Sequence, residues 1–273
     1  PRLRKGVAGV GVGSPSVVVR GLGSARSLNG IQRSEAAKTG SDQHLRYRHG
    51  YGAGVSPVSR ASQAGLQMCL VKDLLPVSTV DLKITTPGIY FGEESNEYAI
   101  VDTTQKEFDY PIGDKNAETS YSGKSGVPVG TPIERIAFAL RFSAPEILLT
   151  SAIKPDSRVL FRRDIKDSID ALAPWLALDG DPYPILIDGR VVWVQDGYTW
   201  SSYYPYSQRY GASNINYMRN SVKVTVDAYS GTTTLYAFDA KDPMLATYRR
   251  IYPGLFTDVP KMPEAVRAHL RYP

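Results

Sequence analysis

The sequence predicts an α+β fold in which antiparallel hairpins form a mixed or antiparallel sheet packed against several short helices. Two pairs of β-branched apolar segments point to the hairpins, because a turn dipeptide joins each pair: Asp188-Gly189 in the first and Ser230-Gly231 in the second. Capping residues and apolar residues at helical spacing point to the helices. Together these observations favour an α+β domain.

The chain is expected to divide into an arm and a folded domain. Residues 1–43 are rich in Gly, Ser and Arg, which is typical of a flexible or loosely attached arm. Residues 44–273 are predicted to form the α+β domain, either as one unit or as two subdomains, near 44–130 and 131–273. A chain of 273 residues is long enough for either arrangement.

Composition narrows the class of protein. A net charge of +5 is spread along the chain without a run of five Lys or Arg residues, so no nucleic-acid partner is expected. The 18 tyrosines against 7 phenylalanines predict many half-buried rings with hydrated hydroxyls. The single cysteine, Cys69, cannot form an intrachain disulfide and is interpreted as a buried small apolar residue.

The first half of the domain is expected to contain short strands, followed by helices. Candidate strands cover residues 67–71, 82–85, 89–92 and 98–101. Thr131 as N-cap, Pro132 in the first turn and Glu134 form a predicted capping box that begins the first helix. We expect one apolar, structural face on this helix, made by Ile133, Ile136, Ala137, Leu140 and Phe142.

Two more helices are predicted before the first hairpin, at residues 146–152 and 165–172. The second of them has a stripe of Ile165, Ile169 and Leu172 that we expect to be buried. The hairpin itself joins 183–187 to 190–194, and its unbroken apolar runs indicate that both faces are covered.

An aromatic segment follows the first hairpin. Asp196-Gly197 is expected to turn the chain into a loop rich in Tyr and Ser, a composition that binding loops use for rigid contact area and adaptable hydrogen bonding. The commoner use of such a sequence is to pack an irregular loop onto its own domain. The residues that we select as a candidate binding surface are Tyr198, Trp200, Tyr203, Tyr204 and Tyr206, with Asp179 and Asp181 nearby in the sequence.

The second hairpin joins residues 222–229 to 232–238. Val222, Val224 and Val226 alternate with polar residues, which predicts one buried face and one face in water. Helices are expected to begin at Pro243 and Pro263, the latter docking on the domain through Val266 and Leu270.

No catalytic residue, metal ligand or cofactor is assigned. His44 and His49 are five residues apart with no third ligand nearby, so each is interpreted as a hydrogen-bonded loop histidine. Gly123-Lys124-Ser125 lacks the first glycine of a phosphate-binding loop. The Gly-x-Ser-x-Gly and His-Glu-x-x-His signatures are missing from the sequence.

Seven blocks in order resemble a bacterial family of large membrane proteins called uncharacterised protein family 0182. They are residues 49–52 (HGYG), 89–93 (IYFGE), 107–111 (EFDYP), 178–184 (LDGDPYP), 204–207 (YPYS), 216–223 (NYMRNSVK) and 268–273 (AHLRYP). The resemblance covers residues 44–273. It implies a protein whose N-terminal part crosses the cell membrane several times and whose long hydrophilic part, which this chain resembles, lies on the extracytoplasmic side.

Two functions are therefore open. The first is a non-catalytic module that binds an envelope protein, glycan or lipid, while transmembrane segments outside this chain provide the attachment to the membrane. The alternative is an envelope enzyme that acts on glycan or lipid through Asp179 or Asp181, since paired carboxylates serve such chemistry. A site must be assembled in space before either function is supported.

Overall fold

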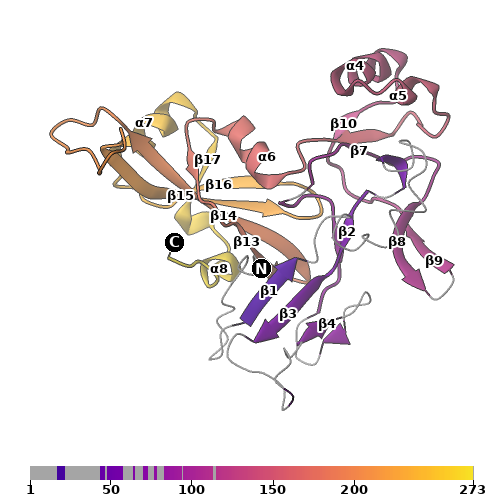
Figure 1. The fold of residues 1–273 in the computed structure, drawn as a ribbon, viewed down its shortest axis with the longest axis horizontal. Helices are drawn as coiled ribbons and strands as arrows, with labels where there is room; N and C mark the ends of the chain where they lie inside the picture. Colours follow the sequence, from indigo (N-terminus) through magenta and orange to yellow (C-terminus); the bar gives the residue numbers. More distant parts are fainter. Residues whose placement is uncertain are drawn as a thin grey trace.

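The fold is α+β, as the sequence predicts, and it places strands and helices in two lobes joined at a continuous core (Figure 1). The structure is a computed structural model that describes residues 17–21, 44–46, 48–57, 64, 70–72, 77–78, 83–93, 95–112 and 115–272. One lobe is built on the largest sheet, and the other carries α4 (Pro132–Phe142) and α5 (Glu146–Leu149) at its end.

The largest sheet is mixed. Its strands are β12 (Ala177–Leu178), β13 (Tyr183–Ile187), β14 (Arg190–Ser201), β15 (Tyr217–Asp227), β16 (Thr233–Ala237) and β17 (Phe256–Asp258). Neighbouring strands pair antiparallel except β16 and β17, which pair in parallel. Both predicted hairpins are confirmed, β13–β14 and β15–β16, although the second turn is wider than Ser230-Gly231 because β15 ends at Asp227 and β16 begins at Thr233. The first turns at Asp188 and Gly189 with φ of 49° and 75°, the left-handed values that a type I′ turn requires.

The expected turn at Asp196-Gly197 is wrong, because β14 continues through both residues to Ser201. A shift in register between Gly197 and Thr199 marks a bulge in the pairing with β15. Gly197 lets the Leu176 side chain pack directly on the strand backbone, because a Cβ on Gly197 would lie 2.6 Å from that side chain.

The prediction of a wet face on the second hairpin is also wrong. Lys223 and Thr225 are buried like the valines that alternate with them, with 2% and 7% of their surface exposed. The Lys223 ammonium group pairs with the Asp196 carboxylate on the neighbouring strand, β14. A buried lysine is tolerated when it is paired in this way.

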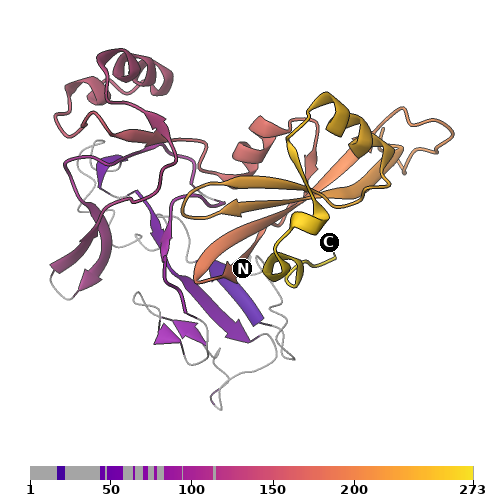
Figure 2. The ribbon, with the colours of Figure 1, turned by 180° about the vertical axis from the view of Figure 1, so that it is seen from behind.

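Helices cover both faces of this sheet (Figure 2). On one face, α6 (Ile165–Leu172) and α7 (Pro243–Ile251) contribute Ile165, Ile169 and Leu245 to the core that holds the β15 valines. Leu172, expected in that stripe, is 46% exposed at the end of α6. On the other face, Val266 of α8 (Glu264–Arg267) packs in the cluster of Tyr183, Ile185 and Val194, and the expected docking of Val266 and Leu270 is confirmed. The 3-10 turn η1 (Val259–Lys261) precedes α8.

Smaller sheets make up the rest of the molecule. β7 (Ala99–Val101), β10 (Val127–Pro128) and β11 (Arg158–Leu160) form one sheet, β8 (Glu107–Ile112) pairs with β9 (Lys115–Thr119), and β2 (Gly50–Tyr51) pairs with β6 (Gly88–Ile89). The predicted strand at 98–101 is confirmed as β7. That at 89–92 shrinks to the end of β6, and residues 83–85 form no strand. Cys69 and residues 67–69 lie outside the described residues.

Part of the expected N-terminal arm is a strand. β1 (Val17–Gly21) pairs antiparallel with β3 (Ala53–Pro57) over its full length, in a sheet completed by β4 (Val71–Lys72) and β5 (Val77–Ser78). The rest of residues 1–43 lies outside the described residues.

The capping box of α4 is confirmed. The Glu134 N–H donates to the Thr131 hydroxyl at 3.3 Å, and the Thr131 N–H donates to the Glu134 carboxylate at 2.9 Å. The apolar face expected on α4 is wrong in its direction, however, since Phe138 and Ala139 pack inward, whereas Ile133 and Leu140 are 80% and 76% exposed. α5 is shorter than predicted and ends before residue 150.

Candidate functional site

An aromatic loop between β14 and β15, residues 202–216, extends from the end of the largest sheet (Figure 1). Three of its tyrosines, Tyr203, Tyr206 and Tyr210, are 88%, 110% and 85% exposed. Trp200, the next-to-last residue of strand β14 before the loop, is 40% exposed. These side chains do not pack on their own domain, which is the commoner use expected for such a sequence. They form an aromatic surface open to contact.

The loop is nevertheless ordered by its own hydrogen bonds. The Asn216 amide donates to the carbonyls of Tyr204 and Ser207 at 2.8 and 3.2 Å, and its oxygen accepts the Tyr204 N–H at 2.9 Å. The Tyr204 ring stacks on Tyr217 with centroids 4.2 Å apart. Tyr204 therefore anchors the loop, whereas its neighbours Tyr203 and Tyr206 point outward. Tyr206 adopts a left-handed φ of 57°, a conformation that a tyrosine takes only when its surroundings hold it there.

Asp242 fixes the base of the loop. Its buried carboxylate accepts the Thr199 hydroxyl at 2.6 Å and the Tyr217 hydroxyl, and it caps α7 through the N–H groups of Met244 and Leu245. Burial alone would raise the pKa of Asp242, but hydrogen bonding by the Ser221, Thr199 and Tyr217 hydroxyls and by the Met244 N–H outweighs it and holds the pKa below the ordinary value. The strand ends that carry the loop are thus tied to α7 by a charged acceptor.

The other predicted residues lie apart from the exposed tyrosines. Asp179 accepts the Asp181 N–H at 2.9 Å on one oxygen and the Tyr198 hydroxyl at 3.1 Å on the other. Asp181 lies 3.5 Å from the Arg271 guanidinium, and its side chain is 48% exposed. The structure thus joins Tyr198, which belongs to strand β14, to Asp179. Each carboxylate has a structural partner: Asp179 stabilises a turn, and Asp181 pairs with the C-terminal segment.

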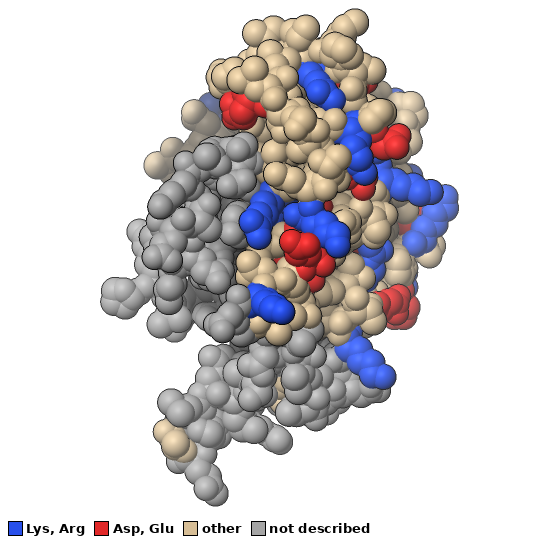
Figure 3. Space-filling view, turned by 90° about the vertical axis from the view of Figure 1, so that its right-hand side faces the viewer, with Lys and Arg blue, Asp and Glu red and all other residues tan. Residues whose placement is uncertain are grey.

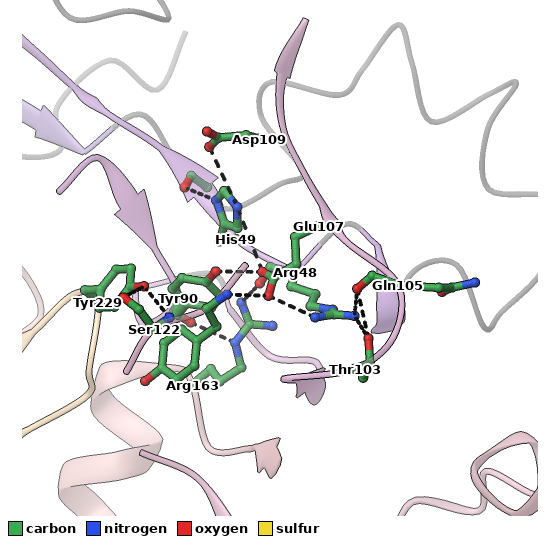
Figure 4. A network of polar contacts seen from close by, with 12 residues as sticks. Arg48, His49, Tyr90, Thr103, Gln105, Glu107, Asp109, Ser122, Arg163 and Tyr229 are labelled. Atoms are coloured by element: carbon green, nitrogen blue, oxygen red, sulfur yellow. Dashed lines mark hydrogen bonds and ion pairs between the residues drawn. The ribbon is translucent and has the colours of Figure 1, made fainter. Parts of the chain in front are cut away.

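Sequence reasoning missed a buried polar network in the other lobe (Figure 4). The Arg48 guanidinium pairs with the Glu107 carboxylate at 2.9 Å, with 1% and 0% of the two side chains exposed. Glu107 also accepts the Tyr90 hydroxyl at 2.6 Å and the Tyr121 N–H at 3.1 Å. Arg163, also buried, donates to the Tyr90 carbonyl at 2.7 Å. Burial raises the pKa of Tyr90 well above its usual range, and the Glu107 carboxylate adds to this effect.

His49 is a buried member of this network, next to Glu107 and Asp109. Its Nδ1 is 2.9 Å from the Gly50 carbonyl, which can only accept, so Nδ1 carries a proton. Its Nε2 lies 4.0 Å from Glu107 and 3.9 Å from Asp109 (Figure 4). Burial and the Glu107 charge raise the pKa of Asp109, and His49 opposes them. The prediction of a hydrogen-bonded histidine is confirmed here and at His44, whose Nδ1 lies 2.8 Å from the Tyr98 carbonyl.

Three features bear on what the candidate functions would need: metal ligands, a hollow and the length of the helices. Within the described ranges, no group of three His, Cys, Asp or Glu side chains is arranged to hold a metal ion. A hollow of about 220 Å³ is lined by uncharged residues, namely Phe91, Ser125, Gly126, Val159, Leu160, Phe161, Ser230, Gly231 and Thr232. It therefore lacks the acid and base that a two-carboxylate mechanism needs. Among the residues that the structure describes, no helix has both the length and the apolar character needed to cross a bilayer.

Fold and surface together define an α+β module with an ordered, outward-facing aromatic loop. The chain belongs to the uncharacterised protein family UPF0182, whose model matches residues 20–273, beginning earlier than the sequence blocks do. Three UPF0182 proteins illustrate the similarity to this chain. The protein of Desulforamulus reducens is 44% identical to it over 92% of this chain, that of Bradyrhizobium diazoefficiens is 44% identical over 92%, and that of Geotalea uraniireducens is 48% identical over 85%. The chain spans only 26–27% of the length of these relatives. No solved structure matches it significantly.

Proposed function

We propose that this chain is the extracytoplasmic part of a multi-pass bacterial membrane protein and acts there as a non-catalytic binding module for an envelope component. The contact surface is the exposed aromatic loop, with Trp200, Tyr203, Tyr206 and Tyr210 as its contact residues. Placement at the cell membrane is supported by the family resemblance, and the relatives, almost four times as long as the matched segment, have room for the membrane-spanning part.

The exposure of three tyrosines on an ordered loop is the observation that carries the binding role. Large aromatic side chains held in water lose contact area that they would gain in a core, so a group of them marks an interaction surface. The Asn216 hydrogen bonds and the Tyr204–Tyr217 stack fix the backbone before any ligand arrives. Such preorganisation reduces the conformational entropy lost on binding.

The alternative of an envelope enzyme acting through Asp179 or Asp181 has less support. The Asp179 carboxylate is engaged by the Asp181 N–H and the Tyr198 hydroxyl, and Asp181 pairs with Arg271. Neither residue lines the hollow described above.

A binding experiment tests the proposal. Purified peptidoglycan sacculi and a detergent extract of envelope proteins are each incubated with the chain and analysed by co-sedimentation and by cross-linking. We expect Tyr203→Ser/Tyr206→Ser/Tyr210→Ser to lose the interaction shown by the wild type by about tenfold or more. Tyr272→Ser removes a tyrosine that is 97% exposed elsewhere, so it serves as the matched control and should bind normally.

Two results would contradict the proposal. One is a loop variant that binds as well as the wild type, and the other is a Tyr272→Ser variant that loses binding equally. The first would show that the loop makes no contact, and the second that any exposed tyrosine suffices.

A further inference from the structure

A second exposed surface lies on α4 and α5, at the opposite end of the molecule from the aromatic loop (Figures 1 and 2). Large aliphatic side chains make up this surface, which we call the α4–α5 face. Its members, with their exposed fractions, are Ile133 (80%), Ile136 (49%), Leu140 (76%), Leu148 (46%) and Leu149 (85%).

The α4–α5 face is not needed for the fold. The inward side of the two helices is made by Phe138, Ala139 and Ile147, which are buried against Val159 of β11 and Ile100 of β7. Each helix thus already has a core-facing side, and the aliphatic residues of the outer side add nothing to it. Single exposed aliphatic residues are ordinary, but five lie on two adjacent helices, and three of them, Ile133, Ile136 and Leu140, share one side of α4 at helical spacing. A group of exposed apolar residues of this kind marks a contact site.

The segment around this face is basic. Residues 124–162 contain six basic and three acidic residues, a net charge of +3 against +5 for the whole chain. Two of the acids have local roles: Glu134 closes the capping box of α4, and Glu146 accepts the Tyr98 hydroxyl at 3.3 Å. The exposed bases are Lys124, Arg141, Lys154 and Arg162. Figure 3 shows that the surface at the top, over α4 and α5, is mostly uncharged, and that Lys and Arg side chains lie beside and below it with some Asp and Glu side chains among them.

We propose that the α4–α5 face rests on the surface of an anionic phospholipid bilayer. The aliphatic side chains enter the boundary between headgroups and acyl chains, and exposed bases such as Arg141 contact lipid phosphates. An apolar helix face with basic residues around it is the pattern of helices that lie in the membrane interface. α4, with 11 residues, is about 16 Å long and therefore lies in the plane of the membrane without crossing it.

Charge favours lipid over a second copy of the chain. Two α4–α5 faces brought together would place like net charges side by side, whereas an anionic bilayer complements them. The geometry also leaves the aromatic loop free, because it extends from the far end of the molecule (Figure 1). The inference is independent of whether the loop binds a ligand.

Vesicle sedimentation tests this inference. Vesicles of phosphatidylcholine with about one quarter phosphatidylglycerol are compared with vesicles of phosphatidylcholine alone. The wild type should sediment with the anionic vesicles and several-fold less with the neutral ones, and added salt should release it. Ile133→Ser/Leu140→Ser/Leu149→Ser should lower the partition coefficient by about tenfold or more.

The triple tyrosine variant of the loop is the matched control, because it also replaces three highly exposed large side chains. It should sediment with vesicles like the wild type, while the α4–α5 variant should keep the envelope interaction assigned to the loop. The two proposals therefore fail separately. Far-UV circular dichroism and thermal melting should be unchanged in both variants, since the replaced side chains are 76% exposed or more.

Three outcomes would overturn the inference. A wild type that fails to sediment with the anionic vesicles ends the proposal directly. Equal sedimentation of the α4–α5 variant and the wild type would show that the face is not the contact. A concentration-dependent dimer in gel filtration that the α4–α5 variant abolishes would assign the face to a second copy.

Discussion

Removing one partner of the buried Arg48–Glu107 pair should destabilise the protein far more than its single 2.9 Å contact suggests. Glu107→Gln keeps the volume of the side chain but leaves the Arg48 guanidinium, 1% exposed, without its counter-charge. Breaking a buried pair in this way costs about 3–5 kcal/mol. Arg48→Met should have a similar cost, because the remaining carboxylate would keep only the hydrogen bonds from Tyr90 and Tyr121.

A double-mutant cycle separates the pair from its surroundings. The free energy of unfolding is measured by urea titration with tryptophan fluorescence, since the Trp193 indole donates to the Phe91 carbonyl inside the core and reports on its integrity. We expect Arg48→Met/Glu107→Gln to be more stable than the sum of the single effects predicts, by about 1–3 kcal/mol.

The surface pair Arg249–Asp258 is the matched control. Its atoms lie 2.6 Å apart, but its side chains are 39% and 52% exposed, so Asp258→Asn should cost at most about 1 kcal/mol. The reasoning is refuted if Glu107→Gln costs no more than this control, or if the two single substitutions simply add.

Further predictions concern acid stability, the first hairpin and the two exposed surfaces. Because the folded-state pKa of Asp242 is lowered, its contribution to stability is present above the unfolded-state pKa of about 3.9 and is lost as pH falls through the folded-state value. Thermal melts from pH 6 to pH 3 should therefore show a smaller loss of stability on acidification in Asp242→Asn than in the wild type, and parallel curves would contradict this. Gly189→Ala should lower the free energy of unfolding by about 1–3 kcal/mol, because φ is +75° and the new Cβ would lie 2.4 Å from the Thr85 hydroxyl. A Cβ added at Gly180 would have no neighbouring atom within 4 Å, so Gly180→Ala should be close to neutral in the same urea titration. Equal costs at the two glycines would count against the turn assignment. The loop variant should lose the envelope interaction and keep vesicle binding, and the α4–α5 variant should do the reverse.

Features that depend on neighbours in sequence were predictable. The Asp188-Gly189 turn, the capping box at Thr131 and the extent of α6 follow from local backbone preferences and from hydrogen bonds within a few residues. The family was also recognisable from short blocks of sequence. The aromatic loop was identified as a unit, although the structure assigns Tyr198 to a strand and pairs it with Asp179.

The sequence by itself determined the α+β class, both hairpins and the turn of the first, the start of α4 and membership of UPF0182. Only the tertiary structure decided which faces are covered: Lys223 became buried because Asp196 lies beside it, and the aliphatic side of α4 stayed in water because the core lies under its other side. Glu107 likewise meets an arginine 59 residues away. Turns and caps are set by local energies, whereas burial and charge pairing depend on contacts between distant segments, which periodicity along one segment cannot reveal.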